Sequence, residues 1–195
     1  MKYTSIIIPD QPPRTILEGY RKGTMPEEFT GGLGLEGVKA LREFVEEGGT
    51  LILLNRASDF AIEQFKLPVR DITAGLPRTE FYVPGSILRV ELDTSHPITR
   101  GMPKESIAWA EESPVFELTE TPDAAHVRVI ASYPKTADPL LSGWLLGGER
   151  IKGKAALVEV TMGKGRIYLF GFRPQYRGQS LATYPLLFNA ITQRR

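Results

Sequence analysis

The sequence of 195 residues contains no cysteine and only two histidines, His96 and His126. Without cysteine the chain has no disulfide, no thiolate nucleophile and no cysteine-ligated metal. Two histidines that stand far apart in the chain form no metal-binding motif, so the sequence predicts no metal site and implies no cofactor. Long apolar runs are missing as well: Leu51–Leu54 is far too short to cross a bilayer, and we predict no membrane segment.

Neither sign of charge dominates, because 24 Lys and Arg residues stand against 23 Asp and Glu residues. A nucleic-acid-binding surface needs an excess of basic residues, so we predict no nucleic-acid partner. Residues Met1–Pro9 carry one positive charge and three consecutive apolar residues, which is typical of a strand and not of an export signal. These features leave the cellular compartment undetermined. The length fits a single domain over residues 1–195.

The first third of the chain alternates between strand and helix patterns. The apolar run Ile6–Ile8 and the segment Thr50–Leu54, apolar from Leu51 onward, predict buried parallel strands. Apolar residues at helical spacing predict a helix over Leu35–Glu47, whereas Asp10–Gly34 lacks periodicity and predicts a long loop. A second helix is expected up to about Phe65, capped by Ser58 or Asp59. This alternation predicts a layered α/β fold with a mostly parallel sheet.

The later part of the chain predicts further strands. Ser86–Asp93 and Val127–Tyr133 alternate apolar and polar residues, as half-exposed strands do. Lys154–Thr161 and Arg166–Phe170 are joined by the turn sequence Met-Gly-Lys-Gly, which predicts an antiparallel C-terminal hairpin. A last helix is expected from about Ser180 to Thr192.

A short motif after the last strand resembles an active-site motif that has lost its chemistry. Residues Phe172-Arg173-Pro174-Gln175 resemble the Phe-His-Pro-Glu sequence of class I glutamine amidotransferase-like domains, whose His and Glu complete a Cys-His-Glu triad. Arginine stays protonated near neutral pH and cannot act as a general base, and glutamine carries no charge. With no cysteine as nucleophile, we predict no catalytic residues and no amidotransferase activity.

The chain as a whole resembles the C-terminal amidotransferase-like domain of some bacterial zinc carboxypeptidases. The resemblance lies in the segments Pro9–Arg14, Ile16–Gly19, Lys22–Glu28, Ser58–Ile62 and Phe170–Gly178. It implies a three-layer flavodoxin-like fold and an accessory role beside a peptidase domain or another protein partner. The peptidase's zinc motif, His-x-x-Glu, is absent from this chain.

The resemblance also implies that a strand and a helix are missing before Ile6, because only five residues precede it. We therefore expect an N-terminally truncated domain with an exposed sheet edge, which favours a homodimer or docking to a partner. Related full-length proteins are expected to be exported.

The turn after Thr50–Leu54 corresponds to the nucleophile elbow of this fold, and Arg56 is expected at the nucleophile position, within one or two residues. Ser58 is expected to cap a helix and not to act as a nucleophile. Strand ends meet at one rim of such a sheet, so Arg56 and Arg173 are expected to lie close together. The candidate anion site also includes four residues that stand close to these two in the sequence or lie in the segments that carry the resemblance: Arg14, Asn55, Gln175 and Arg177.

An alternative weighs more than the anion site: the same arginines pair with Asp10, Asp59 or Glu63 and hold loops together. The leading functional hypothesis is accordingly a non-catalytic accessory domain for interaction or assembly. The second is a module that binds a small anion or a peptide carboxylate at the rim. An enzyme with a rearranged site is the third, and it lacks a base–nucleophile pair that can be named.

Overall fold

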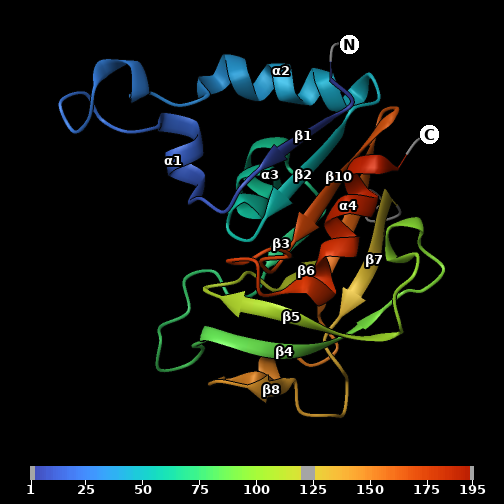
Figure 1. Ribbon diagram of the computed structural model, residues 1–195. Coiled ribbons are helices and arrows are strands. Elements are labelled where there is room, and N and C mark those ends of the chain that lie inside the picture. Colours follow the sequence, from blue (N-terminus) through green and yellow to red (C-terminus); the bar gives the residue numbers. More distant parts are fainter. Residues whose placement is uncertain (1–2, 120–125, 194–195) are drawn as a thin grey trace.

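The computed structural model describes residues 3–119 and 126–193, and it is a mixed α/β structure (Figure 1). Its α-helices are α1 (Pro13–Glu18), α2 (Gly34–Glu46), α3 (Ala57–Phe65) and α4 (Tyr184–Thr192). Its strands are β1 (Ser5–Ile8), β2 (Thr50–Leu54), β3 (Val69–Asp71), β4 (Pro84–Leu92), β5 (Glu105–Glu111), β6 (Phe116–Leu118), β7 (Val127–Ser132), β8 (Leu140–Ser142), β9 (Ala155–Met162) and β10 (Gly165–Phe170). No helix among these residues is long and apolar enough to cross a membrane.

The strands form one mixed sheet in which β1, β2, β10, β9, β7, β4 and β5 are neighbours in that order. Pairing is parallel between β1 and β2 and between β2 and β10. From β10 onward the neighbouring strands pair antiparallel, and so do the short strands β3, β6 and β8. The predicted hairpin β9–β10 is confirmed, but the antiparallel part extends far beyond it. The residues of β4 alternate between buried and more exposed positions, as in a strand with one covered face. Such half-covered strands are typical of antiparallel sheets, because parallel sheets are covered on both faces.

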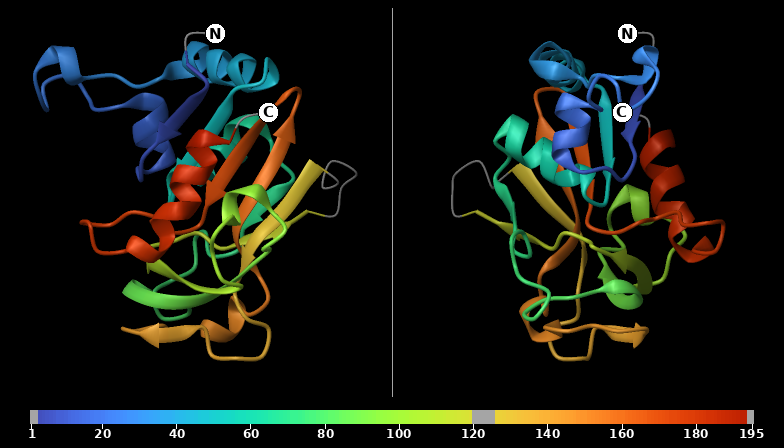
Figure 2. Two further views of the ribbon diagram at one scale, coloured as in Figure 1. Left: turned by 45° about the vertical axis from the view of Figure 1, so that its right-hand side comes forward. Right: turned by 90° about the vertical axis from the view of Figure 1, so that its left-hand side faces the viewer.

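Helices cover both faces of the parallel part of the sheet, which gives three layers there. Leu51 and Leu53 of β2 pack with Ile16 of α1, Val45 of α2 and Phe60 of α3. The alternate residues of β2 point to the other face, where α4 contributes Leu186, Leu187 and Ala190 to a second core. Figure 2 shows α4 on the opposite side of this part of the sheet from α1 and α2. A flavodoxin-like arrangement is therefore present, within a sheet that is mixed.

The predicted loop Asp10–Gly34 contains more structure than expected. Pro13 stands in the first turn of α1, where a fixed φ favours helix and the missing N–H costs nothing. The longest stretch of Asp10–Gly34 without α-helix or strand is residues 19–33, hereafter the arm, which contains one turn of 3-10 helix at Glu27–Phe29. The predicted helices at Leu35–Glu47 and up to Phe65 correspond to α2 and α3.

The two ends of the arm are held together at a narrow neck. The N–H of Leu33 donates to the carbonyl of Ile16 at 2.9 Å, and the N–H of Gly31 donates to the carbonyl of Tyr20 at 3.1 Å. A Cβ on Gly19 would lie 1.7 Å from the carbonyl oxygen of Gly31, so the close approach requires glycine. Beyond this neck the arm projects away from the body past β1, in both Figure 1 and the left view of Figure 2.

Candidate functional site

The turn between β2 and α3 has the geometry of a strained elbow, and its central residue is Asn55. Asn55 has a positive φ of 54°, which is unusual for a residue other than glycine. Its N–H donates to the carbonyl of Phe170 at the end of β10, at 2.8 Å. The elbow residue is therefore one position before Arg56, within the range that the sequence left open.

The expectation that Ser58 or Asp59 caps α3 is wrong. The N-cap residue of α3 is Arg56, which makes no side-chain cap hydrogen bond. Ser58 is buried, and its hydroxyl lies 3.1 Å from the carbonyl of Phe170 and 3.3 Å from that of Leu53, the two acceptors available to it. The helix begins at Ala57, two residues before the start that a cap at Ser58 would require. Ser58 therefore lies within the first turn, and its hydroxyl contacts the ends of β2 and β10 instead of the free N–H groups of α3.

The side chain of Asn55 is fully buried and bridges to the end of β5. Its Nδ2 donates to the carbonyl of Glu111 at 3.2 Å, and its Oδ1 accepts from the hydroxyl of Ser113 at 2.6 Å. The Ser113 hydroxyl in turn accepts from the N–H of Glu111 at 2.9 Å. Both ends of the Asn55 amide therefore have hydrogen-bond partners within the protein. A nucleophile at this position would instead have to be accessible to a substrate.

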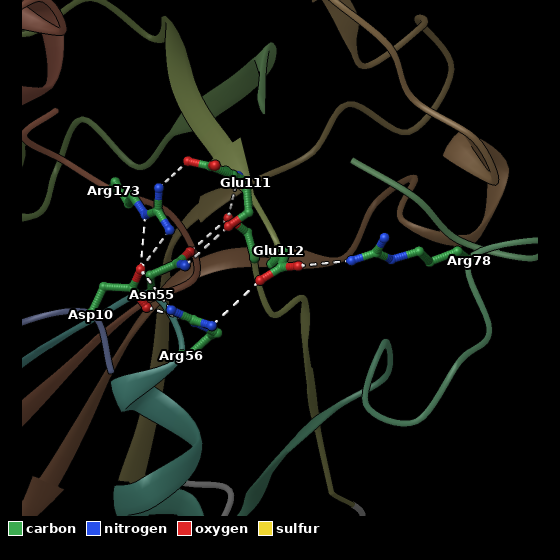
Figure 3. Close-up of polar contacts among 8 residues, drawn as sticks. Asp10, Asn55, Arg56, Arg78, Glu111, Glu112 and Arg173 are labelled. Atoms are coloured by element: carbon green, nitrogen blue, oxygen red, sulfur yellow. Dashed lines mark hydrogen bonds and ion pairs between the residues drawn. The ribbon is translucent and has the colours of Figure 1, made fainter. Parts of the chain in front are cut away.

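Beside this amide, Asp10 lies between the guanidinium groups of Arg56 and Arg173 (Figure 3). Arg56 Nε donates to Asp10 Oδ1 at 2.9 Å. Arg173 Nε and Nη2 lie 2.9 Å and 2.6 Å from Asp10 Oδ2. The side chains of Asp10 and Arg173 are each only 17% exposed. The loop after β1, the elbow after β2 and the segment after β10 therefore meet at one carboxylate.

Two glutamates at the end of β5 complete the network (Figure 3). Arg173 also pairs with the carboxylate of Glu111. Arg56 Nη1 lies 3.4 Å from Glu112 Oε2, and the other oxygen of Glu112 is 3.3 Å from Arg78 Nη2. We define the rim network as Asp10, Arg56, Glu111, Glu112 and Arg173.

The rim network neutralises its own arginines. It contains two positive and three negative side chains, so an added anion would meet no excess of positive charge. Burial raises the pKa of Asp10, but hydrogen bonds and charge from Arg56 and Arg173 outweigh burial and hold that pKa below its ordinary value. Asp10 is therefore ionised at neutral pH, as the ion-pair alternative requires.

The remaining predicted site residues fall into two groups. Gln175 and Arg177 line an open hollow of about 270 Å³ together with Pro9, Asp10, Leu54, Arg173 and Tyr176. The guanidinium of Arg177 lies 5.0 Å from the ring centroid of Tyr176, and it has no carboxylate partner in the described part of the chain. Arg14 does not join this group: it pairs with Glu18 along α1 at 2.7 Å and is exposed.

Sequence reasoning missed Glu111, Glu112 and the packing of Trp109 on this rim. Trp109 stacks on Tyr176 with ring centroids 4.7 Å apart, and its carbonyl accepts from the N–H of Arg173 at 3.1 Å. The only local signal was the pair of acidic residues that follows an alternating apolar stretch. Nothing in that signal pointed to a partner more than fifty positions away, such as Asn55.

A second hollow, of about 200 Å³, lies next to the rim network and is lined by three carboxylates. Asp59 of α3 and Asp71 of β3 line it, with Arg78, Tyr82 and Glu112 at its other walls. Burial, followed by the charges of Asp71 and Glu63, raises the pKa of Asp59 to about 8. Asp71 accepts hydrogen bonds from the N–H groups of Thr73 and Val115 at 2.8 and 3.0 Å.

The helical layers on the parallel part of the sheet and the elbow after β2 fit a glutamine amidotransferase-like fold. No protein-family model matches the sequence, and a search of curated protein sequences found no match. Among solved structures, the chain is similar to a cytoplasmic protein of Salmonella typhimurium, with a TM-score of 0.56, 14% identity, and 97% of this chain and 71% of that chain covered.

Two further structures place this likeness in context. A GMP synthase-like protein of Thermoplasma acidophilum matches with a TM-score of 0.52, 14% identity, and coverage of 96% of this chain and 71% of that chain. A β-galactosidase of Bacillus circulans matches with a TM-score of 0.53 and 15% identity, over 97% of this chain but only 22% of the enzyme. At such identities the similarity establishes the fold alone. The fold thus occurs both as most of a small protein and as a minor part of a large one.

Proposed function

We propose that this chain is a non-catalytic amidotransferase-like domain that acts by binding a protein partner. The observation that carries this proposal is the occupancy of the elbow by Asn55, whose side chain is buried and hydrogen-bonded at both ends. A carboxamide is no nucleophile, and Arg173 beside it is no base. The rim that would hold catalytic groups instead ties three segments of the chain together.

The proposed partner is a peptidase domain, and this part rests on the resemblance of five sequence segments to carboxypeptidase-associated domains. One of these segments, Pro9–Arg14, contains Asp10, and another contains Arg173. The residues that carry the resemblance therefore include those that hold the rim together. On this view the resemblance reflects preservation of a scaffold, and the accessory role belongs to its surface.

The test is an activity assay joined to a binding assay. Purified protein is expected to release no ammonia from glutamine and to hydrolyse no activated ester above the rate of a heat-denatured sample. Activity that disappears in the Asn55→Ala or Ser58→Ala variant would overturn the non-catalytic role. Binding is measured against the catalytic domain of a zinc carboxypeptidase that carries the same five segments, and absence of binding at 100 µM would remove the peptidase as partner.

A second candidate function is binding of a small anion or a peptide carboxylate in the hollow beside the rim. One observation favours it: Arg177 lines that hollow without a carboxylate partner in the described part of the chain, next to the side chain of Gln175. Arg56 and Arg173 contribute less than expected, because carboxylates already neutralise them.

Thermal unfolding with phosphate, sulfate, dicarboxylates and short peptides tests this candidate. A ligand at a hundred times its dissociation constant stabilises a protein by about 2.7 kcal/mol, which is a rise of roughly 5–10 °C at this chain length. The rise should disappear in Arg177→Ala and persist in Arg14→Ala, since Arg14 is an equally accessible arginine away from the hollow. A panel without any shift would remove this candidate.

A further inference from the structure

The outer edge of β1 has no strand partner among residues 3–119 and 126–193. β1 pairs with β2 on one side, and it is the end of the strand order in the described sheet. The N–H of Thr50 donates to the carbonyl of Thr4, so the backbone of Thr4 faces β2. Because successive residues of a strand point their backbone groups to opposite sides, those of Ser5 and Ile7 face outward. This edge thus offers two N–H and two C=O groups at alternate positions.

None of the usual protections against edge pairing is present within β1. The strand Ser5-Ile6-Ile7-Ile8 contains no lysine, no other charge and no proline. Ile7 is paired in register with Ile52, on the face that α4 covers over β2, yet Ile7 itself is 41% exposed. The α4 layer reaches β1 only at Ser5, whose hydroxyl donates to the carbonyl of Ile191 at 3.3 Å, and it leaves the side chain of Ile7 partly open.

The arm adds apolar surface on the same side of the molecule. Tyr20 and Phe29 of the arm are 53% and 65% exposed, and Leu33 and Leu35 at its junction with α2 are 41% and 74% exposed. The arm extends outward past β1, so a molecule docked on β1 would lie next to it (Figures 1 and 2). It is nevertheless ordered at its neck by backbone hydrogen bonds. Compact surface loops whose two ends lie close together, known as Ω-loops, are frequently functional.

The area and the charge of this surface fit a second copy of the chain. These four side chains and Ile7 expose on the order of 500 Å² of mostly apolar surface, against about 800 Å² per partner in a standard interface. The backbone and polar groups of the arm can supply the difference. Within the arm Lys22 pairs with Glu27, and the whole chain has a net charge of +1, so two copies would not repel each other strongly.

We propose that two copies associate through β1 and the arm, with the two β1 strands antiparallel about a twofold axis at Ile6. In this register Ser5 of each copy lies opposite Ile7 of the other and exchanges both backbone hydrogen bonds, which gives four in all. The sheets of the two copies become continuous, and the arm of each copy packs against its partner. The inference rests on the proposed function, in which the domain acts by binding proteins, and it names a second copy of this chain as one such partner.

The experiment is the molar mass of the full chain in solution at 1–100 µM, by sedimentation equilibrium. The wild type is expected to reach twice 21.7 kDa. Ile7→Lys places like charges near each other across the joined strands and should weaken association at least about tenfold, or ~1.4 kcal/mol. The matched control is Leu141→Lys, which puts the same charge on β8 at a residue 42% exposed, and it should leave the dimer intact.

A second pair of variants keeps the test independent of the folding of β1. Phe29→Glu in the arm should weaken the dimer, whereas Phe188→Glu on α4, at a residue 58% exposed, should not. A monomeric wild type at 100 µM overturns the proposal, and so does a dimer that survives both Ile7→Lys and Phe29→Glu. A dimer that Leu141→Lys disrupts equally also overturns it. The activity assay is independent of mass, so failure of the dimer and failure of the non-catalytic role are told apart.

Discussion

Replacement of Asp59 by asparagine should make this protein more stable, and increasingly so as the pH rises. Asp59 stands half-buried in the first turn of α3, and it lines a hollow with Asp71 and Glu112, two further carboxylates, while Arg78 lies at the same wall. Burial comes first among the causes that raise its pKa to about 8, followed by the charges of Asp71 and Glu63. Asparagine has the shape of the protonated acid and cannot ionise.

The sign and the size of the effect follow from the two pKa values. In the unfolded chain an aspartate titrates near ~3.9, whereas Asp59 in the folded protein keeps its proton until about pH 8. Its folded pKa is raised, so its contribution to stability is fully present below the unfolded pKa and is lost as the pH rises through the folded pKa. Each pKa unit between the unfolded and folded values corresponds to about 1.36 kcal/mol, so the upper limit of the stabilisation by Asp59→Asn is roughly 5–6 kcal/mol. Relaxation and water entry reduce it, and we expect about 2–4 kcal/mol, or roughly 5–15 °C in Tm.

The assay is urea unfolding of the wild type and the Asp59→Asn variant at intervals between pH 5 and pH 9. The difference in the free energy of unfolding should grow with pH and level off above pH 8. Glu63→Gln removes one of the charges that raise the pKa, so it should move the levelling-off to lower pH. The exposed Asp138→Asn is the control and should show no such trend. Parallel stability curves for Asp59→Asn and the wild type would refute the reasoning.

Three further predictions concern the rim and the arm. Arg173→Met should cost about 2–4 kcal/mol in urea unfolding, because it removes one of the two cations that hold Asp10; adding Asp10→Asn should restore part of the loss, and fully additive losses would contradict a shared ion pair. Asn55→Ala should lower the free energy of unfolding by about 2–3 kcal/mol, because it removes two hydrogen bonds and keeps a side chain at a positive φ. Asn55→Gly removes the same hydrogen bonds but adopts a positive φ without strain, so it should lose about 1 kcal/mol less. Equal losses would argue against strain at the elbow. Gly19→Ala should open the neck against Gly31 and speed limited proteolysis within the arm at little cost in Tm, and an unchanged cleavage rate would show that the neck tolerates a side chain.

The parallel core was predictable because its signals are local. Leu51–Leu54 is an unbroken apolar run, and every residue of β2 is buried between two helical layers. The hairpin β9–β10 was predicted from its turn sequence for the same reason. The antiparallel extension was harder, because strands such as β5 lie between prolines and carry only a weak alternation. The sequence correctly placed Arg56 and Arg173 at one rim, but local patterns hold no information on which acids would meet them.

The site illustrates where local reasoning ends. Asp10 was named as one partner of the arginines, and it does bridge them. Glu111 and Glu112 were not, since they reach the rim only through the pairing of β4 with β5 and the turn that follows. The positive φ of Asn55 is set by its hydrogen bonds to β10 and to the end of β5, so it depends on segments on both sides of the elbow. Such a conformation is a property of the assembled sheet.

The position of β2 has a consequence for how the protein is made. β2 lies between β1, which precedes it, and β10, which follows it by more than a hundred residues. A growing polypeptide can pair β1 with β2 early, but the other edge of β2 must wait until residue 170 has left the ribosome. Since synthesis proceeds at about 5–20 residues per second, the apolar run of β2 stays half-paired for roughly 6–25 seconds. We expect truncated chains that end before β10 to be recognised by chaperones or to aggregate, whereas chains that contain β10 can close this edge of β2.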